Sequence, residues 1–334
     1  MKNMYKMLFF STMTIGTMIT ISSNSWLSMW LGLEINLLSI IPLMSNIKNK
    51  MESEAAMKYF ITQALASTVL MLAMIIMLSN NDSLMSTYTS MILDTAVLTK
   101  MGAAPFHFWF PEVMEGLSWM NSTIMLTWQK IAPMVIFMYS MKSTMFSVMV
   151  ITMSMTVSGL LGINQTSMRK ILAYSSINHI GWMIAAMLTN QTLWSIYFIV
   201  YSLMTVNMTM MFKTMNISSI NQLMNSMNKN KIIKTMFSMN FLSLGGIPPF
   251  IGFFPKWITI NSMIQENMYM MTMLMIMMTL MSLAFYMRLS FTSMILTTEE
   301  TNKNSPTPNQ MMIMMSNFIV LSSLSLCSMV IYFY

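Results

Sequence analysis

Charged side chains are scarce in this chain of 334 residues. Asp, Glu, Lys and Arg make up only 8% of the sequence, whereas 55% of the residues are hydrophobic. An average soluble domain carries about 25% charged residues. Because so few charges cannot cover a surface that faces water, the composition excludes a water-soluble globular protein.

Cysteine and histidine are nearly absent, which excludes several kinds of redox site. The single cysteine, Cys327, cannot form a disulfide within the chain, hold an iron–sulfur cluster or build a cysteine-based zinc site. The two histidines, His107 and His179, are too few for two bis-histidine haems or for a copper–haem oxidase centre. If the chain takes part in redox chemistry, we expect the electrons to travel through other proteins.

Methionine, by contrast, is very abundant, with 53 residues against 10 glycines. No packing requirement calls for so many copies of a flexible side chain. The methionines are spread along the whole chain and form no motif, which favours codon usage over a methionine-rich metal or ligand surface. An AT-rich genome that reads an extra codon as Met, as many mitochondrial genomes do, gives this composition.

Hydrophobic stretches fill the sequence, and each reaches the roughly 20 residues that a helix needs to cross a membrane. We predict an all-α, polytopic membrane protein with about eleven transmembrane helices, forming a single domain over residues 1–334. The first stretch lacks the cleavage site of a signal peptide. The predicted spans are residues 5–22, 25–44, 55–78, 84–111, 119–140, 144–163, 168–188, 191–213, 235–264, 267–290 and 310–332.

The basic residues in the loops and at the ends of the spans are strongly biased to one side of the membrane. With the N-terminus on side A, thirteen Lys and Arg residues fall on side A and only Lys142 falls on side B. This asymmetry predicts that side A is the cytoplasm or matrix. It also explains the net charge of +7 without any nucleic acid. Of the side-A loops, residues 214–234 suggest a surface amphipathic helix or a solvated connector, and residues 299–309 an exposed loop.

Five charged residues lie well inside the predicted spans, away from the span ends: Glu34, Asp94, Lys100, Lys130 and Lys256. A charge near the centre of a membrane helix costs about 2.5–3.5 kcal/mol even on a lenient insertion scale. A purely structural stretch would not carry that cost repeatedly, so we expect Glu34 and the three lysines to be functional. Asp94 is either a local partner or a residue exposed to water.

Two of the lysines lie beside predicted helix breaks. Lys100 precedes Gly102 and Pro105, and Lys256 follows the sequence GGIPPF. Non-helical backbone within a membrane survives only where it is buried in protein or lines a watery cavity. Burial disfavours the charged form of a lysine, and a nearby carboxylate favours it. A Glu–Lys pair that opens and closes is therefore a physical proton switch.

Each assignment has a structural alternative. Glu34 and Lys100 could form a static clamp between helices, Lys130 could be a structural charge, and Lys256 could extend along Trp257 to the membrane surface. His179 suits either a satisfied core histidine or a proton relay, because its ordinary pKa lies near 6.5.

Four further residues, Glu112, Glu115, Lys58 and His107, lie outside this set of charges. Glu112 and Glu115 are expected in a side-A loop, solvated or tied to a neighbouring loop. Lys58 is expected to extend to the side-A surface. His107 lies in the sequence PFHFWFP, which resembles a re-entrant segment, and the sequence leaves open whether it is structural or functional.

Several motifs resemble the NADH dehydrogenase subunit 2 family, the mitochondrially encoded antiporter-like membrane subunits of respiratory complex I. The resemblance covers roughly residues 5–290. It is carried by WLGLEINLLSIIPL (30–43), ESEAAMKYFITQALAS (52–67), KMGAAPFHFWFPEVMEGLSWMNSTIMLTWQKIAP (100–133), NQTSMRKILAYSSINHIGWM (164–183) and NFLSLGGIPPFIGFFPKW (240–257).

The resemblance implies roles for four residues. Glu34 of GLEINLLS pairs with Lys100 before the first break, and Lys130 of WQKIAP continues the proton path. Lys256 after GGIPPF is the exit or a lateral connection. Asp94 does not match the family pattern, and the last span matches in hydropathy alone.

The resemblance also implies the setting of the protein. The chain would be a core subunit of proton-pumping NADH:ubiquinone oxidoreductase with no redox centre of its own; NADH, FMN, Fe–S clusters and ubiquinone would bind other subunits. Expected partners are other membrane-arm subunits, including neighbouring antiporter-like ones, and anionic lipids such as cardiolipin. The expected location is the mitochondrial inner membrane, with the N-terminus in the matrix, in an invertebrate. The eleven spans match the shortened animal form.

Two competing interpretations remain open. A stand-alone cation/proton antiporter would use the same charges within the membrane. A scaffold that merely spaces other membrane subunits would have no need to move protons.

Overall fold

The described part of the chain is almost entirely α-helical. The structure, a computed structural model, describes residues 2–46, 49–79, 83–227, 231–248 and 250–295. Within these residues the one β feature is an isolated antiparallel bridge between Ser167 and Ser219. The predicted all-α class is therefore confirmed. The last predicted span, residues 310–332, and the loop 299–309 lie outside the described residues.

The chain divides into two compact units, residues 1–150 and residues 151–334. The helices of the first unit are α1 (Lys2–Ser22), α2 (Trp26–Met44), α3 (Lys50–Ser79), α4 (Ser83–Met101), α5 (Trp109–Gly116), α6 (Trp119–Leu126) and α7 (Trp128–Ser140). After α8 (Thr144–Ile163), which crosses the boundary, the second unit holds α9 (Met168–Thr189), α10 (Gln191–Met215), α11 (Ile220–Met227), α12 (Lys231–Gly245), α13 (Phe253–Gln265) and α14 (Tyr269–Ile295). The single domain over residues 1–334 stays a prediction.

The number of membrane spans is not settled by helix length. Six described helices are long and apolar enough to cross a membrane by themselves: α2, α3, α8, α9, α10 and α14. Three other predicted spans are each divided into two shorter helices, α4–α5, α6–α7 and α12–α13. Neither helix of such a divided span is recognised as a membrane span by itself, so the count of eleven remains a prediction.

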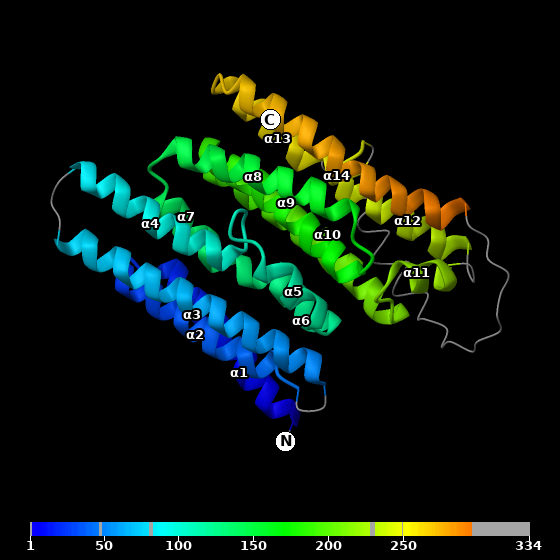
Figure 1. Cartoon of the computed structure of the whole chain (residues 1–334), viewed down its shortest axis with the longest axis horizontal. Helices are drawn as coiled ribbons and strands as arrows, with labels where there is room; N and C mark the ends of the chain where they lie inside the picture. The colour runs from blue at the N-terminus through cyan, green and yellow to red at the C-terminus, as the bar shows by residue number, and fades with distance from the viewer. Residues whose placement is uncertain (1, 47–48, 80–82, 228–230, 249, 296–334) are drawn as a thin grey trace. The chain divides into compact units, whose positions relative to one another are not determined.

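Close helix pairs build the first unit. Gly16 of α1 faces Gly32 of α2, where a Cβ atom on Gly32 would lie 2.8 Å from the Gly16 carbonyl oxygen. Such small residues let two helix backbones approach closely in a membrane protein. Helix α3 runs beside α4, as Figure 1 shows, and α4 in turn packs against α7. These contacts bring α2, α3, α4 and α7 around one buried region.

Helix α9 forms the core of the second unit. Every residue from 171 to 187 is buried, because α9 packs against α10, α13 and α14. A helix that is buried all round is normally apolar on every face. The buried polar side chains of α9, Asn178 and His179 among them, are therefore exceptions that need partners.

Two helix interruptions occur where the sequence predicts them, and both begin with the same backbone motif. Gly102 after α4 and Gly246 after α12 have positive φ angles of 74° and 77°. At the first, Ala103 N–H donates to the Leu98 carbonyl and Gly102 N–H to that of Thr99. This Schellman pattern satisfies carbonyl groups at a helix end. The breaks span residues 102–108 and 246–252.

A third interruption was not expected, since residues 119–140 were predicted as one continuous span. The structure ends α6 at Leu126 and begins α7 at Trp128. The Thr127 side chain donates to the Thr123 carbonyl at 2.7 Å. The Thr127 backbone has φ −113° and ψ −73°, away from ordinary helical values, and no Gly or Pro at the position signals this in the sequence.

The polar loop predicted over residues 214–234 contains the short helix α11. Its start is tied to the segment before α9, because Met168 N–H donates to the Ser218 carbonyl and Ile220 N–H to the Thr166 carbonyl. A helix is therefore present, as the first of the two interpretations (an amphipathic helix or a solvated connector) predicts. Its contact with a membrane surface stays a prediction.

The second interruption predicts a severe effect of Gly252→Ala. A Cβ atom there would lie 1.8 Å from the Ser243 carbonyl oxygen, which is fixed backbone of α12. We expect a loss of more than about 1–3 kcal/mol, seen as a lower melting temperature of the detergent-solubilised protein. Gly159→Ala, whose Cβ would meet its nearest atom at 3.4 Å, is the matched control. Equal melting temperatures of the two variants would contradict the prediction.

Candidate functional site

Two of the predicted lysines lie at the ends of facing helices in the first unit. Lys100 is the penultimate residue of α4, and Lys130 is the third residue of α7. Both are buried, with Lys130 only 2% exposed. The Lys130 ammonium lies 5.6 Å from the centre of the Phe110 ring, a distance at which the ring attracts a cation. Lys100 at the C-terminal end of α4 is favoured by the helix dipole, whereas the first turn of α7 disfavours a cation.

Glu34 lies close enough to Lys100 for its negative charge to act on that lysine. The two side chains make no N–O contact within 4.0 Å among the described residues, so they do not form a closed ion pair. Glu34 is half-buried, and its buried Oε1 atom has no hydrogen-bond partner in the described part of the chain. The predicted pair is therefore brought together and left open, unlike a static clamp.

A polar network fills the space next to Lys100. Tyr59 O–H donates to Gln129 Oε1 at 3.3 Å, and Gln129 Nε2 donates to Asn36 Oδ1 at 2.8 Å. Gln63 Nε2 donates to the backbone carbonyl of Lys100 at 3.4 Å. These residues line a largely enclosed cavity of about 10 Å³, near the lower limit of space for one water molecule.

This network was not predicted from the sequence. Asn36 follows Glu34 by two residues, and Gln129 directly precedes Lys130. Uncharged polar residues cost less in a membrane than charges do, so they stand out less against the hydrophobic background. The available signal was their position within GLEIN and WQK, the motifs that also hold the charged residues.

Asp94 of α4 is a buried carboxylate that faces α7. Its side chain is 1% exposed and accepts a hydrogen bond from the Ser140 hydroxyl. Of the two sequence interpretations, the structure therefore supports the local partner and contradicts the water-exposed residue.

Lys256 lies in the first turn of α13 in the second unit and bridges the interruption before it. Its ammonium donates to the Gly245 carbonyl, the last residue of α12, at 2.8 Å, and lies 5.9 Å from the Trp182 ring centre. Lys256 is 6% exposed, whereas Trp257 is on the surface. The alternative in which Lys256 extends along Trp257 is therefore wrong in this structure. A Cβ atom on Gly246 would lie 2.9 Å from Lys256 Nζ, so the lysine needs glycine there.

His179 is buried in α9 and lies one helical turn before Trp182. Its Nδ1 atom makes a hydrogen bond of 2.9 Å with the Tyr197 hydroxyl, and the Tyr201 ring lies 5.0 Å away. This bond satisfies Nδ1, as a core histidine requires, and a histidine beside a hydroxyl can also exchange a proton with it. The geometry agrees with both interpretations, and the relay stays a prediction.

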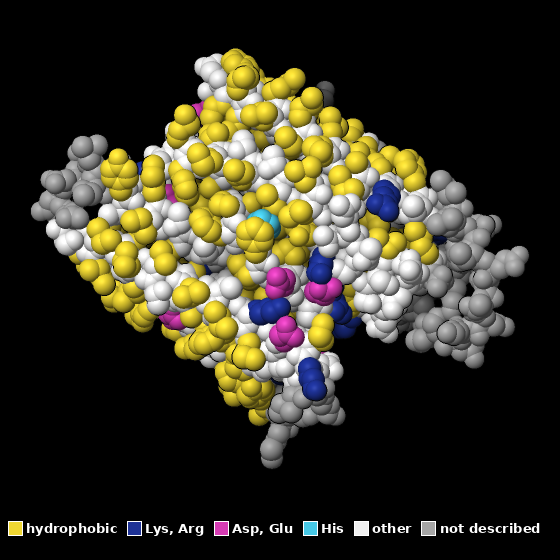
Figure 2. All heavy atoms as spheres, viewed as in Figure 1, with side chains coloured by type: hydrophobic (Ala, Val, Ile, Leu, Met, Phe, Trp, Pro, Cys, Tyr) yellow, Lys and Arg dark blue, Asp and Glu magenta, His cyan; other side chains and the backbone are white. Residues whose placement is uncertain are grey.

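The remaining charged candidates lie away from this buried region. Glu112 and Glu115 belong to α5 and not to a loop as expected. Lys58 is exposed and forms ion pairs with Glu54 at 3.1 Å and Glu112 at 2.9 Å. Figure 2 shows charged side chains gathered in a small area, with hydrophobic side chains over most of the visible face. His107 is buried in the first interruption, with Nδ1 at 3.3 Å from the Pro105 carbonyl.

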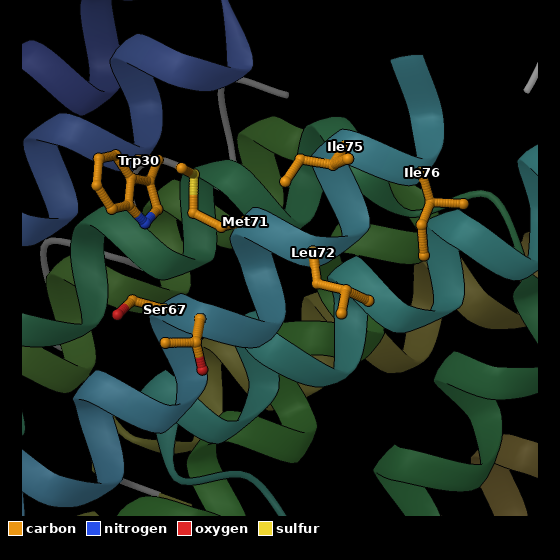
Figure 3. A pocket seen from close by; sticks show the side chains of 7 residues that line it. Trp30, Ser67, Met71, Leu72, Ile75 and Ile76 are labelled. Atoms are coloured by element: carbon orange, nitrogen blue, oxygen red, sulfur yellow. The ribbon is translucent and has the colours of Figure 1, made fainter. Parts of the chain in front are cut away.

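A groove of about 470 Å³ lies between α2 and α3 (Figure 3), and none of its lining residues is charged. Trp30 comes from α2, and the other lining residues, such as Met71 and Ile75, come from α3. The described residues hold no group of three His, Cys, Asp or Glu side chains that could bind a metal ion.

Comparison with known proteins identifies the family. Residues 23–282 match the model of the NADH:quinone oxidoreductase/Mrp antiporter membrane family. The chain is 44% identical to NADH-ubiquinone oxidoreductase chain 2 of Anopheles gambiae, over 99% of both chains. It is 45% identical to the protein of the same name from Locusta migratoria, over 90% of this chain and 88% of the relative. The chain belongs to the family of NADH-ubiquinone oxidoreductase chain 2, which confirms the resemblance found in the sequence motifs.

Solved structures share the fold at low sequence identity. A chain of respiratory complex I from Thermus thermophilus superposes with a TM-score of 0.86 and 22% identity, over 96% of this chain and 78% of that one. A chain of the Mrp complex from a Dietzia species gives a TM-score of 0.76 and 16% identity, over 88% of this chain and 61% of that one. The antiporter-like fold is thus found in more than one kind of membrane complex.

The polar network predicts that Gln129→Leu destabilises the protein. The substitution leaves the Tyr59 hydroxyl and the Asn36 amide oxygen without their partner, at a cost of about 1–3 kcal/mol for each buried group. We expect a lower melting temperature in detergent. Gln165→Leu, which removes an exposed hydrogen bond to Leu161, should change stability by less than about 0.5 kcal/mol. An equal effect of the two substitutions would argue against the network.

Proposed function

We propose that the chain is a core membrane-arm subunit of proton-pumping NADH:ubiquinone oxidoreductase. In this proposal it moves protons through Glu34, Lys100, Lys130 and Lys256, with His179 as a relay. The names of the relatives from Anopheles gambiae and Locusta migratoria support the complex. The observation that carries the proton path is the burial of three lysines, each within a few residues of a helix interruption.

Proton transfer begins with the open Glu34–Lys100 pair. When Glu34 moves toward Lys100, its carboxylate stabilises the ammonium and favours proton uptake by the lysine. When it moves away, the buried ammonium loses that stabilisation and favours release. Opening and closing of this pair thus converts a movement of α2 against α4 into a change in proton affinity.

The network of Asn36, Tyr59 and Gln129 connects the first lysine to the next. Its hydrogen-bonding groups lie between α2, α3 and α7, and a water molecule in the adjoining cavity would have polar partners on three sides. Water that is hydrogen-bonded in this way can carry a proton from Lys100 toward Lys130. Lys130 then presents its ammonium to the Phe110 ring, which attracts the cation.

Lys256 would end or redirect the path. Its bond to the Gly245 carbonyl places it at the C-terminal end of α12, where the helix dipole favours a cation. His179 lies on the same core helix as Trp182, which contacts Lys256, and its hydrogen bond to Tyr197 gives a route for a proton.

The same proposal sets the surroundings of the subunit. We infer about eleven spans in one antiporter-like domain, the mitochondrial inner membrane as location and the N-terminus in the matrix. The partners would be other membrane-arm subunits, including neighbouring antiporter-like ones, with anionic lipids such as cardiolipin at the basic rim. NADH, FMN, Fe–S clusters and ubiquinone would bind elsewhere in the complex, and coupling would be conformational and electrostatic.

The path predicts the effect of two substitutions in the assembled complex. Glu34→Gln removes the moving charge and Lys130→Ala removes a proton carrier, so both should lower the number of protons pumped per NADH oxidised. The measurement is proton uptake by sealed membrane vesicles, with assembly checked on native gels. Lys142→Ala, at a side-B position outside the path, is the control. An unchanged ratio in both variants of an assembled complex would favour the scaffold interpretation.

Lys130→Arg separates a proton carrier from an electrostatic anchor. Arginine keeps the positive charge and hardly releases its proton. We expect the pumped ratio to fall as it does in Lys130→Ala. A normal ratio in Lys130→Arg would mean that Lys130 supplies only a fixed charge.

A stand-alone cation/proton antiporter is the second candidate, because the shared fold of the Mrp complex chain favours it. The purified chain in vesicles with an imposed cation gradient should then move protons by itself. Recovery of the chain only within a very large NADH-oxidising complex, with no exchange by the isolated chain, supports the subunit.

A further inference from the structure

Asp94 is a buried acidic residue that is not part of the proposed proton path. Helix α4 packs most extensively against α3 and α7. The titratable residues on α4, α7 and residues 60–79 of α3 are Tyr88, Asp94, Lys100, Lys130 and Tyr139, and both tyrosines are exposed. No basic nitrogen lies within 4.0 Å of the Asp94 carboxylate in the described part of the chain.

Such a group is costly as a permanent anion. A carboxylate removed from water is tolerated when it is paired and fully hydrogen-bonded, and here one neutral hydroxyl, that of Ser140, supplies the hydrogen bond. A carboxyl group that is buried but can exchange a proton avoids this cost in one of its two states. A side chain of merely structural duty at this position could be Asn or Ser.

The position of Asp94 continues the direction of the path. It precedes Lys100 by six residues, about 9 Å along α4. Its partner Ser140 follows Lys130 by ten residues, about 15 Å along α7. Both displacements lead from the lysines toward the start of α4 and the end of α7. The predicted topology puts those two helix ends on side B, opposite the N-terminus.

Apolar side chains separate the lysines from Asp94. Val97 and Leu98 on α4 and Met134 and Phe137 on α7 are all buried, with at most 1% exposure. We therefore expect a proton to pass between the lysines and Asp94 only when water enters between the two helices. An apolar barrier with a lysine on one side and a carboxyl on the other is what a gated proton step requires.

We propose that Asp94 is the proton acceptor on the side-B half of the first unit, and that it connects the buried lysines to water on side B. This inference rests on the proposed function. In the step, an N–H bond of the Lys100 or Lys130 ammonium breaks, and water entering between α4 and α7 passes the proton to a carboxylate oxygen of Asp94. The lysine becomes neutral and Asp94 becomes a carboxylic acid. The acid then releases its proton to side-B water, and the Ser140 hydroxyl holds the returning carboxylate in place.

The test compares Asp94→Asn, Asp94→Glu and Ser140→Ala in the assembled complex, with protons pumped per NADH oxidised as the measurement. Asn keeps the shape and polarity of Asp and cannot carry a proton, so the ratio should fall as far as it does in Lys130→Ala. Glu restores a carboxyl group and should restore most of the ratio. Ser140→Ala keeps the carboxyl and should give an intermediate loss. Glu266→Gln, an exposed carboxylate at the end of α13, is the matched control and should change nothing.

The outcomes separate this inference from the function on which it rests. A loss in Lys130→Ala with a normal ratio in Asp94→Asn would overturn the role of Asp94 and leave the proposed function intact. Normal ratios in both would overturn the proposed function. Equal losses in Asp94→Asn and Asp94→Glu would show that the pair with Ser140 is a structural contact. If Asp94→Asn prevents assembly, Ser140→Ala decides, and a normal ratio in that variant would overturn the role of Asp94.

Discussion

The whole arrangement depends on how interrupted helices satisfy their backbone inside a nonpolar environment. An exposed peptide group in lipid costs several kcal/mol, so a break survives only if other groups bond to the freed carbonyls. Here glycines with positive φ close the last turns of α4 and α12. Side chains satisfy further carbonyls at these helix ends: Trp109 donates to the Thr99 carbonyl, and Lys256 donates to that of Gly245. The lysine that belongs to the candidate path is thus also part of the structural solution.

The three lysines are held in three different ways, and this difference suits proton transfer. Lys100 has a helix C-terminus and a nearby but separate carboxylate, Lys130 has an aromatic ring, and Lys256 has a backbone carbonyl and an indole. Each interaction is weaker than a closed, buried ion pair. A closed pair would fix the protonation state, because removal of either charge would leave the other uncompensated. In the proposed path, small movements of the helices would therefore change which lysine holds a proton.

Much of this could be predicted from the sequence, since charges are conspicuous in a hydrophobic chain and GGIPPF cannot continue a helix. The breaks after α4 and α12 were found for that reason, as was the burial of the lysines. The break at Thr127 was not, because neither Gly nor Pro stands at this position. The structure shows the break as a departure of the Thr127 backbone from ordinary helical values, with φ −113° and ψ −73°. The loop expected around Glu112 is also a helix. Phe110, Val113 and Met114 are buried at helical spacing, but they follow directly on the first break, so the sequence did not mark them as a separate helix.

The sequence by itself determined the class of protein, the breaks at Gly102 and Gly246, and which charges required an explanation, because each follows from composition or from local backbone chemistry. Tertiary structure decided which of these groups meet. It joined Asn36, Tyr59 and Gln129 from three helices, turned Asp94 toward Ser140, and directed Lys256 back to α12 and away from the surface. These contacts link residues far apart in the chain, and their geometry depends on helix packing, which no local pattern specifies.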